Sequence, residues 1–148
     1  MKILHVLDHS VPLFSGYSFR SRSIIHAQRA LGLKPVVLTS PKHEAATNGM
    51  EEIEGIQYYR AASCADDALG SMPFVGELNL MLRMTRRVAA VAQREKVDLI
   101  HSHSPLLNGF PSLWVAHQLR IPLVYETRAF WEDEAVAHQT FKENLIPF

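Results

Sequence analysis

Short apolar runs alternate along the chain with longer segments in which apolar residues recur every three or four positions. The short runs favour buried strands, and the longer segments favour helices with one apolar face. Strands are expected at residues 2–7, 35–39, 55–60, 97–101 and 121–125, and helices at 18–31, 73–96, 106–119 and from about 132 onward. Because strands and helices alternate, this order predicts an α/β fold with a mostly parallel sheet and helices on both faces.

Breaks in the pattern mark where these elements end. Gly32 follows the last apolar position of the first helix and is expected to end it, because glycine tolerates the backbone conformation found there. The segment 40–54 is polar and contains Asn48-Gly49, a turn signal, so no strand is expected in it. Residues 61–72 are small or acidic and suggest a linker. Residues 1–148 are therefore expected to form a single domain.

Composition excludes several classes of protein. Of the 148 residues, 47% are hydrophobic, and the 15 Lys and Arg balance the 15 Asp and Glu, which argues against a whole-domain grip on nucleic acid. The lone cysteine, Cys64, has no partner for an internal disulfide and fits a reducing compartment. The first residues show no signal-peptide pattern, and no apolar run reaches the length that spans a bilayer. We therefore expect a cytoplasmic domain.

Polar and aromatic residues gather where the predicted parallel strands end. In such sheets, ligands bind outside the carboxyl ends of the strands. The segments expected at this edge are 8–18, 39–43, 101–105 and 126–131. The sequence therefore places a binding site at this edge of the sheet.

The first of these segments holds one glycine, Gly16, at the entry of a helix. It lacks both the dinucleotide-binding glycine motif and the phosphate loop of nucleotide hydrolases, so neither class is favoured. Gly16 either lets a ligand approach the backbone or simply forms a turn. Arg20 and Arg22 lie near the start of the same helix, where the helix dipole disfavours cations. Either a bound anion offsets this cost or both arginines are solvated.

Two further pairs share a strand face because residues i and i+2 point the same way. His101 and His103 form one pair, but no third metal ligand lies at close spacing, so a hydrogen bond to a hydroxylated ligand or a structural role is favoured over a metal. Glu126 and Arg128 form the other pair. They either form an ion pair or hold a hydroxyl or a phosphate, which Arg binds bidentately. Phe130 and Trp131 follow directly and suit the stacking of a sugar ring.

Together these segments resemble the N-terminal domain of family 4 glycosyltransferases, the retaining group with the GT-B fold. The resemblance covers nearly the whole chain, through segment 2–7, the loop to Gly16, the Asp98-Leu99-Ile100-His101-Ser102-His103 string and segment 122–128. Segments 5–12, 38–43 and 124–133 look more narrowly like the bacterial subgroup found with exosortase and PEP-CTERM exopolysaccharide loci.

The resemblance implies a Rossmann-like domain that mainly holds the acceptor, facing a C-terminal donor-binding domain that this chain does not contain. Gly16 would lie against the donor diphosphate, with Tyr17, Arg20 and Glu126 as further donor-site residues. The family's histidine after the fifth strand would fall near Arg128, where this chain has none. Either Arg128 replaces it or His103 takes part of its role, so these two are the expected catalytic residues. Such enzymes typically need no metal or other cofactor.

The resulting expectation is a hexosyltransferase in the synthesis of exopolysaccharide or another cell-surface glycan. It would transfer a sugar from a nucleotide-sugar to a glycan or lipid-linked acceptor with retention, and the 148-residue chain alone would be inactive because the donor half is missing. A lipid-linked acceptor would place the protein at the inner face of the membrane. Two alternatives remain open: a non-catalytic α/β module that binds a small ligand, and a GT-B sugar epimerase.

Overall fold

A computed structural model describes residues 1–41, 43, 49–60 and 73–128. Six strands form one sheet in the order β3-β4-β2-β1-β5-β6. The strands are β1 (Lys2–Leu7), β2 (Lys34–Thr39), β3 (Gly49–Ile53), β4 (Ile56–Arg60), β5 (Leu99–His103) and β6 (Leu123–Glu126), and the helices are α1 (Gly16–Ala30), α2 (Pro73–Glu95) and α3 (Leu106–Leu119).

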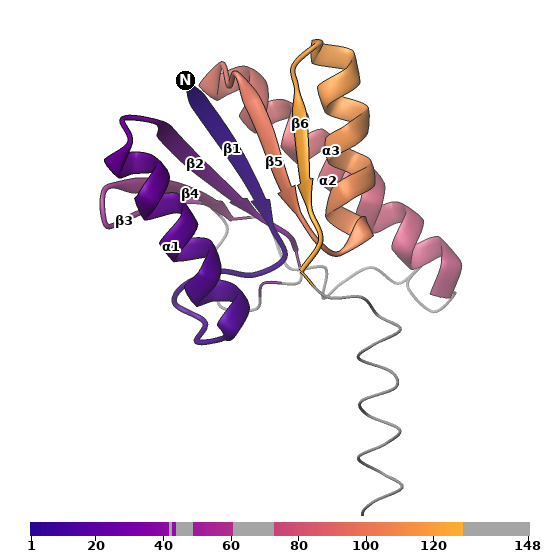
Figure 1. Ribbon diagram of the computed structural model, residues 1–148. Coiled ribbons are helices and arrows are strands. Elements are labelled where there is room, and N and C mark those ends of the chain that lie inside the picture. Colours follow the sequence, from indigo (N-terminus) through magenta and orange to yellow (C-terminus); the bar gives the residue numbers. More distant parts are fainter. Residues whose placement is uncertain (42, 44–48, 61–72, 129–148) are drawn as a thin grey trace, which may run out of the picture.

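The predicted architecture is confirmed. All neighbouring strands pair in parallel except β3 and β4. Helix α1 lies on one face of the sheet, and α2 and α3 lie on the other (Figure 1). Gly32 follows α1 with a φ of 80°, which confirms its predicted place after the helix end. No helix among the described residues combines the length and the apolar character needed to cross a bilayer.

Strand β3 corrects the prediction that 40–54 holds no element. It pairs antiparallel with β4 through the two-residue turn Glu54-Gly55, whose residues both have positive φ (54° and 74°), as tight hairpins require. The strand was missed because β3 is an exposed edge without alternating apolar residues. A hairpin of this kind is signalled only by the Glu-Gly pair between Ile53 and Ile56.

Strands β5 and β6 begin two residues later than predicted and also end later, so His103 and Glu126 are the last residues of their strands rather than part of the loops that follow. Helix α1 begins two residues earlier than predicted, at Gly16, because Ser15 caps it and accepts a hydrogen bond from the backbone N–H of Ser18. The helix predicted from about residue 132 lies outside the described residues.

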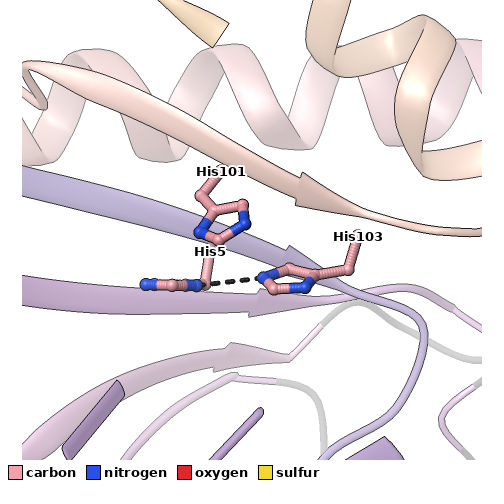
Figure 2. A group of neighbouring side chains, drawn as sticks. All are labelled: His5, His101 and His103. Atoms are coloured by element: carbon pink, nitrogen blue, oxygen red, sulfur yellow. Dashed lines mark hydrogen bonds between the residues drawn. The ribbon is translucent and has the colours of Figure 1, made fainter. Parts of the chain in front are cut away.

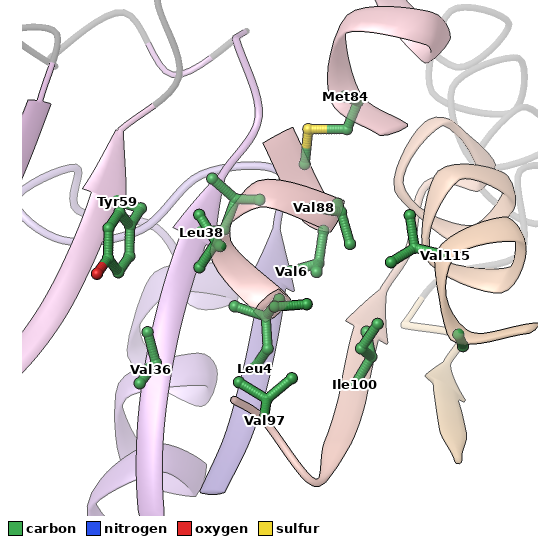
Figure 3. Close-up of a cluster of buried hydrophobic side chains, with 13 residues drawn as sticks. Leu4, Val6, Val36, Leu38, Tyr59, Met84, Val88, Val97, Ile100 and Val115 are labelled. Carbon is green, nitrogen blue, oxygen red and sulfur yellow. The ribbon is translucent and has the colours of Figure 1, made fainter. Parts of the chain in front are cut away.

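Alternation along the strands divides the core into two layers. The larger layer lies between the sheet and helices α2 and α3 (Figure 3). The smaller layer lies under α1. The larger layer consists of Leu4, Val6, Val36, Leu38, Tyr59, Met84, Val88, Val91, Ala92, Val97, Ile100, Val115 and Ala116, and the smaller of Leu7, Ile25, Val37, Ile56 and Tyr58.

The strand order reverses at β1. Strand β2 lies on one side of β1, and β5, which is entered later in the chain, lies on the other. The carboxyl ends of β1 and β5 therefore flank the point where connections leave in opposite directions, which is the usual ligand-binding position in open α/β sheets.

Candidate active site

A polar cluster occupies the α1 side of β1, β5 and β6 beside the smaller core layer. In β1, Leu4 and Val6 face α2 and α3, so His5 faces the α1 side. The same alternation brings His101 and His103 of β5 and Glu126 of β6 to this side, as register pairs His5 with His101 and His103 with Glu126. Within this cluster, the side chains of His5 and His103 are fully buried.

Arg128 joins the cluster to helix α1. Its Nη1 donates to the carbonyl of Tyr17 (2.9 Å) and to Oγ of Ser21 (2.7 Å), and its guanidinium lies over the Tyr17 ring, 4.2 Å from the centroid. Its Nη2 donates to Nδ1 of His103 at 2.6 Å. Because its side chain is only 7% exposed, Arg128 is a buried cation whose donors mostly serve the protein itself.

The Arg128 contact fixes the protons of two histidines. A guanidinium only donates, so His103 Nδ1 must accept and His103 Nε2 must carry the proton. His103 Nε2 then donates to Nδ1 of His5 (3.1 Å), and His5 Nε2 donates to Oε1 of Gln28 (2.8 Å). The result is one hydrogen-bonded chain that runs from Arg128, two residues beyond β6, through β5 and β1 to Gln28 of α1.

Burial keeps the three histidines of the cluster neutral. Burial lowers the pKa of His5 to about 4, and the hydrogen bond to Gln28 offsets only part of this decrease. Burial is also the main cause that lowers the pKa of His103 and of His101. The Arg128 charge adds to the effect on each histidine. All three are therefore neutral imidazoles near pH 7.

The Glu126 carboxylate contacts two of the histidines and both arginines of the cluster. Its Oε2 lies 3.3 Å from Nε2 of His101 and 3.2 Å from Nδ1 of His103, and its Oε1 lies 3.3 Å from Nε of Arg128. Arg20 reaches the same Oε1 with Nη2 at 2.9 Å. Arg20 is 60% exposed at its side chain, so it is the cation of this cluster that a ligand can reach.

Tyr17 closes the edge of the sheet between β1 and β5. Its hydroxyl accepts from the backbone N–H of Asp8 (3.1 Å) and donates to the carbonyl of Ser104 (3.2 Å). Burial raises its pKa to about 12, so the phenol stays protonated. Gly16 beside it is exposed, and an added Cβ there would meet no atom within 4 Å, so the start of α1 is open to a ligand.

A small cavity lies across the same edge, on the side of α2 and α3. Asp8, Ser40 and Asn108 supply its polar lining. Ser40 donates to Oδ1 of Asp8 at 3.0 Å. Oδ1 of Asn108 is buried and has no hydrogen-bond partner among the described residues. The lining of the cavity therefore combines a carboxylate, a hydroxyl and a side-chain amide.

Most of the predicted site residues come together. Tyr17, Arg20, His103, Glu126 and Arg128 form one contact network, whereas Gly16 stands beside it at the open start of α1. Arg20 pairs with Glu126 and Arg22 with Glu54, and both arginine side chains remain exposed to solvent, at 60% and 43%. The bound anion that the sequence suggested for them stays a prediction.

His5, Gln28 and Ser21 were missed. His5 had a detectable signal, because it is a lone histidine between apolar strand residues and has the opposite phase to Leu4 and Val6. Gln28 and Ser21 had no such signal, since both are ordinary polar residues of an amphipathic helix.

Comparison with solved structures places the fold. The chain is similar to the C-terminal domain of the PF1911 hydrogenase from Pyrococcus furiosus (TM-score 0.61, 14% identity, 84% of this chain and 89% of that one). It is also similar to the UDP-GlcNAc 2-epimerase from Methanocaldococcus jannaschii (TM-score 0.54, 12% identity, 84% and 31%) and to CalG4, the calicheamicin glycosyltransferase (TM-score 0.52, 11% identity, 98% and 38%). At such identities the likeness shows the fold alone.

This chain spans about a third of the length of the epimerase and of CalG4. No curated protein sequence matches the chain. The family model described as "Glycosyl transferase 4-like domain" matches residues 15–146, which include α1 and the residues of β5 and β6 that form the cluster. With a match over most of its length, the chain belongs to the glycosyl transferase 4-like domain family.

Proposed function

We propose that this chain is the acceptor-side half of a retaining hexosyltransferase that moves a sugar from a nucleotide-sugar to a hydroxyl group. The observation that carries the proposal is the cluster at the reversal of strand order, in a chain of the glycosyl transferase 4-like family. Its exposed cation, Arg20, and the open start of α1 at Gly16 lie at the same edge. Both features suit the diphosphate of a nucleotide-sugar.

Arg20 is proposed as the direct contact to the donor diphosphate. Its partner Glu126 is held by His101 and Arg128, so Arg20 is positioned before a ligand arrives. In such a site, stabilising the charge that develops on the leaving diphosphate is the largest contribution to catalysis. That Arg128 and His103 touch the reacting groups stays a prediction, and the burial of both favours a positioning role.

The acceptor hydroxyl is proposed to bind near the small cavity. Asp8 supplies a carboxylate to the lining of this cavity, and a sugar hydroxyl is a matching donor. Acceptors in exopolysaccharide or other cell-surface glycan synthesis are glycans or lipid-linked sugars. This role would place the enzyme in the bacterial cytoplasm, and a lipid-linked acceptor would bring it to the inner membrane face. Retention, this pathway and metal-independent catalysis all remain proposals.

The proposal is tested on the complete gene product. An intact mass well above the 16.7 kDa of this chain is expected, because the proposal requires a second, donor-binding domain. UDP- or GDP-sugars should then raise its melting temperature, and NMR of the transfer product should show the donor's anomeric configuration. The 148-residue chain by itself is expected to show no turnover.

Arg20→Ala is the site variant, and Arg22→Ala is the matched control on the same helix. Removing one charge-assisted contact costs about 1.5–3 kcal/mol, so Arg20→Ala should weaken donor binding at least about tenfold. Arg22 pairs with Glu54 at the β3–β4 turn, and its loss should leave donor binding unchanged. Equal effects of the two variants would contradict the proposed donor contact, and sugar isomerisation without an acceptor would favour an epimerase instead.

A further inference from the structure

Three histidines meet on the α1 side of the sheet, although only two are close in sequence. His5 comes from β1, and His101 and His103 come from β5 (Figure 2). One ring nitrogen from each lies within 4.8 Å of the other two. Nδ1 of His5 and Nε2 of His103 are 3.1 Å apart. The third ligand that the sequence did not offer at close spacing is thus supplied by the fold.

Each of these histidines has an acceptor behind it. Oε1 of Gln28 lies 2.8 Å from Nε2 of His5. Oε2 of Glu126 lies 3.3 Å from Nε2 of His101 and 3.2 Å from Nδ1 of His103. Histidines that bind metals nearly always donate their other N–H to a carboxylate or carbonyl oxygen in this way, which fixes the tautomer and the ring orientation.

We propose that His5, His101 and His103 form a binding site for one divalent transition-metal ion of the zinc class. Neutral imidazole is a preferred ligand of zinc, and three histidines leave a fourth position open for water or an anion. Zinc–nitrogen bonds of about 2.0–2.1 Å in a tetrahedral site separate the ligand nitrogens by about 3.3 Å. The His5–His103 pair already has nearly this separation, and the His101 ring must turn to approach them.

Arg128 opposes this site and Glu126 supports it. While Arg128 donates to Nδ1 of His103, the proton of that ring is on Nε2, the nitrogen that faces His5. A metal on Nε2 requires the proton on Nδ1, where Oε2 of Glu126 can accept it at 3.2 Å. Metal binding thus moves one proton between two nitrogens of the same ring, releases none, and displaces the Arg128 guanidinium from His103.

This competition sets the proposal apart from the proposed transfer reaction, which is expected to need no metal. Either Arg128 holds His103 or the metal does, so the metal-bound state is an alternative arrangement of the cluster. The inference does not rest on the transferase assignment, because it uses only the contacts of the three histidines, Gln28, Glu126 and Arg128.

Titration calorimetry with zinc alone tests the site. The chain is purified without a histidine tag, stripped with a chelator and titrated with ZnCl₂. One zinc per chain is expected, with zinc K-edge absorption showing three imidazole nitrogens at about 2.0 Å. His101→Gln should weaken binding at least about tenfold, and Gln28→Leu should do so by about 10–100-fold through the orientation of His5. His117→Ala, at an exposed histidine of α3, is the control and should change nothing.

The direction in which Arg128→Met changes zinc affinity is the decisive result. It removes the group that holds His103 in the unfavourable tautomer, so zinc binding should become several-fold tighter, whereas a general loss of structure would weaken it. Circular dichroism of each variant confirms that it is folded. The proposal is overturned if folded wild-type protein binds no zinc, if His101→Gln binds as tightly as wild type, or if Arg128→Met weakens binding.

Discussion

Strands β1 and β5 present two chemically different faces. Toward α2 and α3 they direct Leu4, Val6 and Ile100 into the larger core layer. Toward α1 the alternate positions of the same strands carry His5, His101 and His103. One pair of strands therefore anchors the fold on one side and builds the candidate site on the other.

The two faces obey different energetic rules. On the apolar face, the stability lost when a side chain is shortened depends on the volume removed and not on the identity of the surrounding apolar residues. On the histidine face, the stability lost depends on how many buried polar atoms are left without a hydrogen bond. Each such atom has given up its contact with water and gains nothing in return. The following predictions separate the two rules, and each uses the free energy of unfolding or the melting temperature of the chain.

Leu4→Ala is expected to have the largest effect. Leu4 is fully buried beneath α2, and truncation of such a side chain costs about 2–5 kcal/mol. Urea unfolding should show a lower midpoint with an unchanged slope. Leu31→Ala, at a residue that is 80% exposed, serves as the control and should shift stability by less than about 0.5 kcal/mol. A Leu4→Ala loss as small as the control's would show that the larger layer does not anchor the fold.

His5→Leu should have an intermediate effect of about 1–3 kcal/mol, because it leaves Nε2 of His103 and Oε1 of Gln28 without partners. Gln28→Leu removes one of those orphaned groups. In the double variant the combined loss should therefore be smaller than the sum of the single losses by at least about 0.5 kcal/mol. Strict additivity would mean that the His5–Gln28 hydrogen bond contributes nothing.

Glu54 provides the smallest effect, in an exposed group of charges at the rim of the smaller layer. Hydrogen bonds from Arg22, and next from His26, lower the pKa of Glu54 from 4.5 to about 2. Its contribution to stability should therefore be complete above pH 4.5 and be lost as pH falls toward 2.

The measurement compares melting temperatures of wild type and Glu54→Gln. Wild type should be slightly more stable near neutral pH, and the difference should shrink with added salt and be lost as pH falls through about 2. Glu52→Gln, at an exposed residue of the adjoining strand, should match wild type throughout. A difference that persists unchanged at low pH would exclude the charge as its source.

Sequence pattern was sufficient wherever burial imposes a period. The parallel strands and the three described helices were predicted because apolar residues repeat along them. Strand β3 has no buried face and therefore no repeating apolar positions. It pairs with β4 because the turn residues Glu54 and Gly55 adopt positive φ.

The candidate site was only partly predictable for a different reason. Pairing of i and i+2 residues placed Glu126 with Arg128 and His101 with His103, and both pairs do share a face. What the chain alone could not show is that Arg128 reaches His103 across 25 residues, or that Gln28 lies behind His5. Such contacts depend on how α1 packs on the sheet, which no local pattern encodes.

The Tyr17 hydroxyl, which ties Asp8 to Ser104, has an entropic consequence. Its two hydrogen bonds join the loops that follow β1 and β5 before any ligand is present. A molecule that enters between them meets walls that are already ordered, so little of its binding free energy is spent on freezing loops. Affinity at this edge should thus depend on what the ligand touches rather than on how much of the protein it must organise.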